Sequence, residues 1–200
     1  DTTIIMVAAD SRIRSNSIEV LSNNIRMSLN LSASLEKSKC EHVILLSSIA
    51  VYGRTGKNLI TEQSPVNPDS FYAVAEVCRE RIIKKTCEVF DIPLTILRLG
   101  KIYGEGDRKS PIFIFVCNVI NGSPIEIYGN GFHNLYCVHE DDVFKTVKLI
   151  IAQSRFGDFN LVPDCGVSLL DLAEMVMSSG GRRVPVIFKP STEVPIELVF

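Results

Sequence analysis

The chain has 200 residues, of which 46% are hydrophobic and 22% are charged, and its formal net charge is −2. This length and composition are typical of one globular domain, or of one domain with a small lobe. Without an excess of basic residues, we expect neither a nucleic-acid partner nor an anionic membrane surface. An anionic sugar nucleotide would need only local positive charge, so the charge balance leaves such a ligand open.

The six cysteines are scattered along the chain, with no CxxC pair and no Cys/His spacing typical of zinc sites. They are expected to be reduced thiols in a cytoplasmic protein that holds no metal. No apolar run reaches the roughly 18 residues of a transmembrane helix, and no signal peptide precedes the first predicted strand.

The first half of the chain alternates between short apolar runs and amphipathic segments. This alternation of strand and helix predicts parallel βαβ units. Residues 3–9 carry apolar side chains on both faces, as a buried parallel strand does. In chain order we expect a strand at 3–9, a helix at 18–35, a strand at 42–46 that runs into 47–53, a helix at 70–90, a strand at 94–99 and a glycine-rich loop at 100–111.

The pattern changes after about residue 110. We expect a helix at 112–120, a strand at 124–128 with a turn at 129–131, a helix at 139–151, a strand at 159–162 and a last helix from Ser168, with Asp171 completing a capping box. The tail at 184–200 predicts no definite element. The predicted fold class is α/β: a Rossmann-like parallel sheet in residues 1–110, and a small mixed α/β lobe in 111–200 that returns a strand to the sheet near 159–162.

Three segments carry residues capable of chemistry in a fixed order. Residues 47–53 (SSIAVYG) end the second strand, Tyr72 follows on a helix 24 residues after Ser48, and residues 98–107 (RLGKIYGEGD) follow the third strand. The carboxyl ends of parallel strands line the crevice where α/β proteins bind ligands. Ser48 and Tyr72 are therefore expected to face one crevice.

These segments resemble the extended short-chain dehydrogenase/reductase family, the NAD-dependent nucleotide-sugar epimerases and dehydratases. Residues 65–82 are similar to its P-x-x-P-x-S-x-Y-x-x-x-K helix, and residues 98–107 to its R-P-x-N-x-Y-G-P-G-D segment. The resemblance implies that Tyr72 is the general acid/base and that Ser48 holds the sugar. It also implies NAD or NADP as cofactor, a nucleotide-diphosphate sugar as substrate, and a homodimer formed through helices 18–35 and 70–90.

The resemblance extends to residues that would contact the two ligands. The implied cofactor-binding residues are Ala8, Ala9, Asn24, Ser47, Tyr72 and Leu99. The implied substrate-binding residues are Ser48, Gly100, Lys101, His133 and Asn134, the last two standing near the place of a family arginine.

Two departures set this chain apart from the family pattern. Glu76 stands where the catalytic lysine belongs, and a carboxylate there would raise the pKa of Tyr72, where a lysine would lower it. The sequence also contains no G-x-x-G-x-x-G turn, which would hold the pyrophosphate of a dinucleotide. Because the first strand corresponds to the family's fourth, we expect about 60 residues of βα units to be missing upstream.

Plainer alternatives remain beside these assignments. Ser47 and Ser48 could cap a turn, Tyr72 could pack into the core, Asn24 could bond only to backbone, and Lys101 could be a solvated loop lysine. His139 with the acidic residues 140–142 suggests a metal site, but the start of a helix explains that run better. The whole chain could also be a truncated or degenerate non-catalytic binding or dimerisation module, or an atypical reductase acting on a non-sugar carbonyl.

Overall fold

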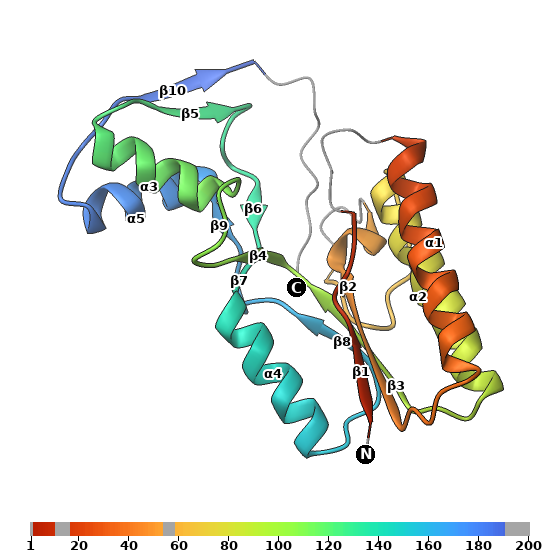
Figure 1. Ribbon diagram of the computed structural model, residues 1–200. Coiled ribbons are helices and arrows are strands. Elements are labelled where there is room, and N and C mark those ends of the chain that lie inside the picture. The colour runs from red at the N-terminus through yellow and green to blue at the C-terminus, as the bar shows by residue number, and fades with distance from the viewer. Residues whose placement is uncertain (1, 11–16, 54–58, 191–200) are drawn as a thin grey trace.

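The computed structural model describes residues 2–10, 17–53 and 59–190 of the chain (Figure 1). The helices are α1 (Ile18–Leu35), α2 (Phe71–Val89), α3 (Pro111–Asn121), α4 (Glu140–Ala152) and α5 (Leu169–Ser179), with a short 3₁₀ helix η2 (Ile49–Tyr52). The strands are β1 (Thr3–Met6), β2 (His42–Ser48), β3 (Leu94–Leu99), β4 (Lys101–Tyr103), β5 (Ile125–Tyr128), β6 (Asn134–Leu135), β7 (Cys137–His139), β8 (Gly157–Leu161), β9 (Val167–Ser168) and β10 (Val186–Lys189).

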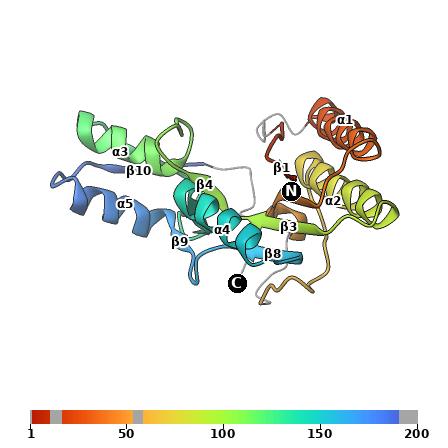
Figure 2. The same ribbon diagram turned by 60° about the horizontal axis from the view of Figure 1, so that its bottom comes forward.

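The main sheet has four parallel strands in the order β1-β2-β3-β8. In Figures 1 and 2, α1 and α2 lie on one face of this sheet and α4 lies on the other. Leu45 and Ile96 pack with Ile83 and Leu35 on the side of α2 and α1. Ile44, Leu97 and Leu99 pack with Val143, Val147 and Ile150 of α4. The predicted Rossmann-like parallel sheet is confirmed, with helices covering both faces.

β1 lies at an edge of this sheet. Met6 is buried, but the side chains of Ile5 and Val7 are 41% and 64% exposed. The expectation that residues 3–9 form a strand buried on both faces is therefore wrong for the described structure, where the strand spans only Thr3–Met6. The alternation of apolar residues is the same for a central and for an edge strand, so the sequence could not separate the two.

A second core lies beyond the sheet, at the left of Figures 1 and 2. There α3 and α5 pack against the parallel pair β5 and β10, and the buried residues of this core include Phe115, Ile125, Ile127 and Leu172. β10 falls in the tail for which the sequence predicted no element. The sequence assigned residues 111–200 to the lobe, apart from one strand near 159–162. In the structure both β8 and α4 pack with the main sheet, so the second half of the chain contributes a helix to the sheet as well as a strand.

Serine side chains cap the N-termini of the α-helices α2, α3 and α5. Ser70 Oγ accepts a hydrogen bond from the amide of Ala73 at 3.1 Å, and Ser168 Oγ accepts one from the amide of Asp171 at 3.0 Å. Ser110 caps α3 in the same way, with Pro111 as its first residue. Such caps stabilise a helix start by about 1 kcal/mol each. Of the predicted capping box, the structure shows the Ser168 cap, while the Asp171 carboxylate accepts from the Ser168 hydroxyl at 2.7 Å. The cap at Ser70 places Tyr72 in the first turn of α2.

Within the ranges that the structure describes, no helix combines the length and the apolar character that a membrane crossing requires.

Candidate functional site

Ser48 and Tyr72 meet at the carboxyl end of the main sheet. Ser48 is the last residue of β2, where it pairs in register with Leu99, the last residue of β3. Its side chain accepts a hydrogen bond from the amide of Ala50 at 3.2 Å and lies close enough to the Tyr72 hydroxyl to lower its pKa. The structure therefore brings together the two hydroxyl groups that the sequence assigned to catalysis. Their catalytic role stays a prediction.

Burial and a neighbouring carboxylate raise the pKa of Tyr72 to about 12. Burial of the phenol is the larger cause, and the charge of Glu76 adds to it. The hydrogen bond with Ser48 and the charge of Arg79 act in the opposite direction but do not cancel the shift. The sequence-based expectation that Glu76 would raise this pKa agrees with the structure.

Glu76 is buried in an ion pair with Arg79, one turn further along α2. Arg79 Nη1 lies 2.6 Å and 2.7 Å from the two carboxylate oxygens, and the side chains of Arg79 and Glu76 are 0% and 1% exposed. Arg79 Nη2 also donates to the carbonyl of Ala8 at 3.0 Å. Burial raises the pKa of Glu76, and Arg79 opposes this rise. Glu76 is thus part of an ion pair that connects α2 to the segment after β1.

The segment after β1 carries the first predicted cofactor contacts. Ala8 and Ala9 are exposed at the carboxyl end of the strand, as a ligand-lining backbone requires. Asn24 is fully buried in α1, where its Oδ1 accepts from the amide of Asp10 at 2.7 Å and its Nδ2 donates to the Asp10 carbonyl at 3.0 Å. Asn24 therefore fixes this segment by backbone bonds, the simpler of the two roles considered for it.

Ser47 belongs to a buried network instead of an open site. Its hydroxyl donates to Glu80 Oε1 at 2.6 Å, and Arg98 holds the same carboxylate through Nε at 3.0 Å and Nη2 at 2.8 Å. Arg98 Nη1 donates to the Tyr52 hydroxyl at 2.9 Å, which in turn donates to Asn160 Oδ1 at 2.8 Å. The network joins α2, η2 and the three strands β2, β3 and β8, so it stabilises the end of the sheet where Ser48 lies.

Gly100 and Lys101 leave the sheet directly after Leu99. A side chain at Gly100 would place its Cβ 2.3 Å from the carbonyl oxygen of Tyr136, so only glycine fits this crossing. The amide of Lys101 donates to that same carbonyl at 2.7 Å and starts β4, which pairs in parallel with β7. The Lys101 side chain is exposed and thus accessible to an anionic ligand.

His133 and Asn134 lie in the lobe, before and within β6. Asn134 pairs in register with Ser168 of β9. Burial lowers the pKa of His133, so its imidazole is neutral near pH 7. Two residues after Asn134, the chain reaches the Tyr136 carbonyl that Lys101 contacts. The hydrogen bond from Lys101 to Tyr136 links the lobe to the end of β3. Among the described residues, no hydrogen bond connects His133 or Asn134 to Ser48 or Tyr72.

His139 begins α4, and its Nδ1 accepts from the amide of Asp141 at 3.2 Å. Across the described ranges, no three His, Cys, Asp or Glu side chains gather closely enough to hold a metal ion. The acidic run 140–142 forms the first turn of α4, as the electrostatics of a helix start favours.

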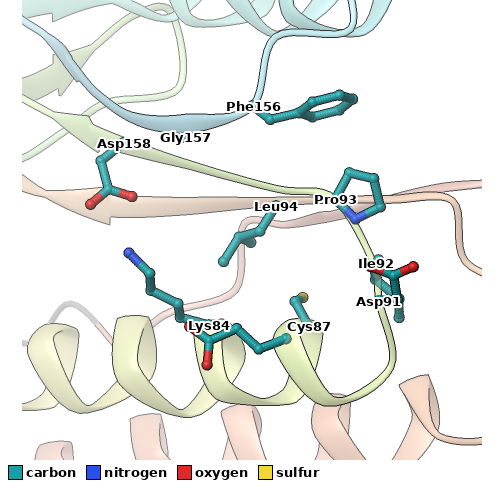
Figure 3. Close-up of a pocket in the computed structure, with 10 residues that line it drawn as sticks. Lys84, Cys87, Asp91, Ile92, Pro93, Leu94, Phe156, Gly157 and Asp158 are labelled. Atoms are coloured by element: carbon teal, nitrogen blue, oxygen red, sulfur yellow. The ribbon is translucent and has the colours of Figure 1, made fainter.

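A cavity in the described structure lies at the other end of the sheet. It measures about 460 Å³ and is lined by residues such as Lys84, Cys87, Leu94 and Asp158, which lie between the last turns of α2 and the beginnings of β3 and β8 (Figure 3). None of the predicted site residues lines it. Since ligands of α/β proteins bind beyond the carboxyl ends of the strands, its place in the fold does not support it as the active site.

The sequence analysis missed Arg79, Glu80 and Asn160. Arg79 and Glu80 follow Glu76 on α2 at the spacing of one helical turn, so an intrahelical pair was a possible signal. The partners of Glu80 and Asn160 come from other strands, and no local pattern indicates them.

A cofactor of the nicotinamide dinucleotide type fits part of this site. Exposed backbone at Ala8 and Ala9, next to the Ser48–Tyr72 hydroxyl pair, could line the nicotinamide end. Glu76 could not bond a ribose as a lysine would, because Arg79 occupies both of its oxygens.

Comparison with known proteins identifies the family. The NAD dependent epimerase/dehydratase family matches residues 1–161. The chain belongs to this family. It is 25% identical to a dTDP-4-dehydro-6-deoxy-D-allose reductase of a Streptomyces species, over 97% of this chain and 64% of the relative. It is 32% identical to a putative UDP-glucose 4-epimerase of Methanocaldococcus jannaschii, over 88% of this chain and 59% of the relative.

Solved structures share the fold. A UDP-N-acetylglucosamine 4-epimerase from Methanobrevibacter ruminantium, in complex with UDP-N-acetylmuramic acid, superposes with a TM-score of 0.91 at 22% identity, over 98% of this chain and 66% of that one. The UDP-glucose 4-epimerase of Thermus thermophilus, in complex with NAD, gives 0.89 at 20% identity, over 100% and 68%. The chain thus spans about three fifths of the length of the two curated relatives.

Proposed function

We propose that this chain acts, with NAD or NADP, in the epimerisation, dehydration or reduction of a nucleotide-diphosphate sugar. Ser48 positions the sugar and Tyr72 moves a proton to or from a sugar oxygen. The proximity of the Tyr72 hydroxyl, in the first turn of α2, to Ser48 at the carboxyl end of β2 is the observation that carries the proposal. A coenzyme of this type supplies hydride transfer, while the protein orients the reacting oxygen and handles its proton.

The substrate would extend from Ser48 toward the lobe. Gly100 and Lys101 border this path directly after β3, and the exposed ammonium of Lys101 can meet a diphosphate as a point charge. His133 and Asn134 would take the nucleotide part from the lobe. The names of the family relatives, which act on UDP- and dTDP-linked sugars, support this substrate class.

The proposal includes a cytoplasmic homodimer. The helices α1 and α2 pack side by side on one face of the sheet, where the hydroxyls of Thr86 and Ser32 bond at 2.8 Å. Outward from this pair, α1 exposes the apolar side chains of Ile18 and Leu29, which are 69% and 53% accessible. A second copy of the helix pair would cover them, and light scattering of a Leu29→Glu variant tests this arrangement.

Glu76 is the observation that favours the non-catalytic alternative, because the family's chemistry needs a cation at that position. The retained Ser48–Tyr72 pair favours the enzyme.

Calorimetric titration tests the proposed function directly. UDP-glucose and dTDP-glucose should bind more tightly than free glucose, and Lys101→Ala should weaken both nucleotide sugars without changing the fold. Lys145→Ala, an exposed lysine of α4 on the other face of the sheet, serves as the matched charge control. If neither nucleotide sugar binds, or if both lysine variants lose the same affinity, the proposed site is wrong.

A further inference from the structure

Glu76 and Arg79 form one buried unit that holds the helix of Tyr72. A single Arg79 nitrogen lies within 2.7 Å of both Glu76 oxygens, and the second terminal nitrogen bonds the Ala8 carbonyl. Because neither side chain reaches solvent, the two charges are fixed in place and water does not screen them. The pair therefore ties the first turns of α2 to the segment that would line the coenzyme.

Burial is the largest cause of the raised Tyr72 pKa, and this unit supplies the charged groups that act on the same phenol. The groups that act on the phenol are Glu76 and Arg79 from its own helix and Ser48 from the end of β2. Glu76 lies one helical turn away and engages the charge of Arg79, so the cation does not act unopposed on the phenol.

We propose that the Glu76–Arg79 pair keeps Tyr72 a proton donor, so that the site accepts a nucleotide-linked keto sugar in preference to a sugar alcohol. This inference rests on the proposed function and deepens it, because it assigns a direction to the reaction. Oxidation of a hydroxyl group needs a phenolate at Tyr72 to take the proton. Reduction of a ketone needs the neutral phenol to give one.

The step balances with a reduced nicotinamide coenzyme as the second reactant. The carbonyl carbon receives a hydride, with its two electrons, and the C=O double bond becomes a C–O single bond. The carbonyl oxygen receives the Tyr72 proton, while the coenzyme is oxidised to its nicotinamidium form. Tyr72 then recovers a proton from water. With a Tyr72 pKa of about 12, phenol exceeds phenolate about 10⁵-fold at pH 7, which suits this direction.

Tyrosinate absorbance measures the proton on Tyr72 without any ligand. The titration of Tyr72 is obtained by subtracting that of Tyr72→Phe, with each pH reached by rapid mixing so that spectra precede alkaline unfolding. We expect a pKa near 12 in the parent chain and a fall of roughly one unit or more in Glu76→Gln, where Arg79 acts unopposed. Glu88→Gln, from the exposed Lys85–Glu88 pair on the same helix, should leave the titration unchanged.

If Glu76→Gln does not fold, the double variant Glu76→Lys with Arg79→Glu replaces it. This variant exchanges the two charges and keeps the pair neutral overall, and it should also lower the Tyr72 pKa. The proposal is overturned if Tyr72 titrates at or below its ordinary value near 10, or if neither variant moves it. Initial rates supply the second readout: a dTDP-linked 4-dehydro-6-deoxy sugar with NADPH or NADH should react faster than dTDP-glucose with NADP⁺ or NAD⁺.

In Glu76→Gln the preference for the keto sugar should shrink by roughly tenfold per unit of pKa lost. A faster oxidation in the parent chain would overturn the proposed direction. Failure of all nucleotide sugars to bind would instead reject the proposed function, while the titration of Tyr72 still decides whether Glu76 and Arg79 control its proton.

Discussion

Placing a lysine at position 76 by Glu76→Lys alone should strongly destabilise the chain. Glu76 is buried with Arg79 at 2.6 Å, so the substitution removes a buried anion and leaves a guanidinium without its partner. Breaking a buried pair costs about 3 to 5 kcal/mol, and a second cation beside Arg79 adds repulsion. Since domains are stable by about 5 to 15 kcal/mol, this loss removes a large part of the stability.

Urea unfolding followed by circular dichroism measures this loss. Glu88→Lys is the matched control, because Glu88 also stands three residues from its partner on α2 but is exposed, and surface pairs contribute only about 0 to 1 kcal/mol. Glu76→Lys combined with Arg79→Glu should recover much of the stability, since it restores opposite charges. A Glu76→Lys variant within about 1 kcal/mol of the parent would refute the buried ion pair.

Three further predictions concern the same end of the sheet. Between pH 10 and 12 the parent chain should lose about 2 kcal/mol more stability than Tyr72→Phe, because the raised Tyr72 pKa stabilises the fold below pH 10 and this contribution disappears as pH rises through about 12; urea titrations across this range check it. Gly100→Ala should lower the melting temperature by several degrees in calorimetry, since its Cβ would lie 2.3 Å from the Tyr136 carbonyl oxygen; an unchanged melting temperature would contradict this close approach. Arg98→Met should cost about 3 to 5 kcal/mol by leaving Glu80 buried without its cation, and adding Glu80→Met should recover part of this loss; additive losses in denaturant unfolding would argue against the pair.

The sequence predicted the central layer of the fold because each of its elements has a local signature. The strands at 42–48 and 94–99 contain apolar runs, the helix α2 between them begins at the Ser70 cap, and α1 before them carries an apolar stripe. Their parallel arrangement follows from the alternation of strand and helix. The short strands β4, β6, β7 and β9 have two or three residues each, too few to show a period, so they were not predicted.

The candidate site was also predicted only in part from the sequence. Tyr72, Glu76 and Glu80 follow one another at four-residue steps on one helix, so the sequence alone placed a carboxylate one turn from the tyrosine. The chain also determined that Ser48 ends a strand. That these two segments meet rested on a resemblance until the structure placed Ser48 close enough to Tyr72 to act on its pKa.

Only the tertiary structure decided which charges are paired. Arg79 bonds the Ala8 carbonyl 71 residues away, and Arg98 reaches Glu80, Tyr52 and the neighbourhood of Asn160 across three elements. Burial of these side chains depends on how α2 packs on the sheet, and burial determines whether a carboxylate shifts a neighbouring pKa strongly or is screened by water. The sequence thus specified that a glutamate stands at position 76, one helical turn from Tyr72. Only packing specified that the Glu76 carboxylate is buried, pairs with Arg79 and raises the pKa of Tyr72.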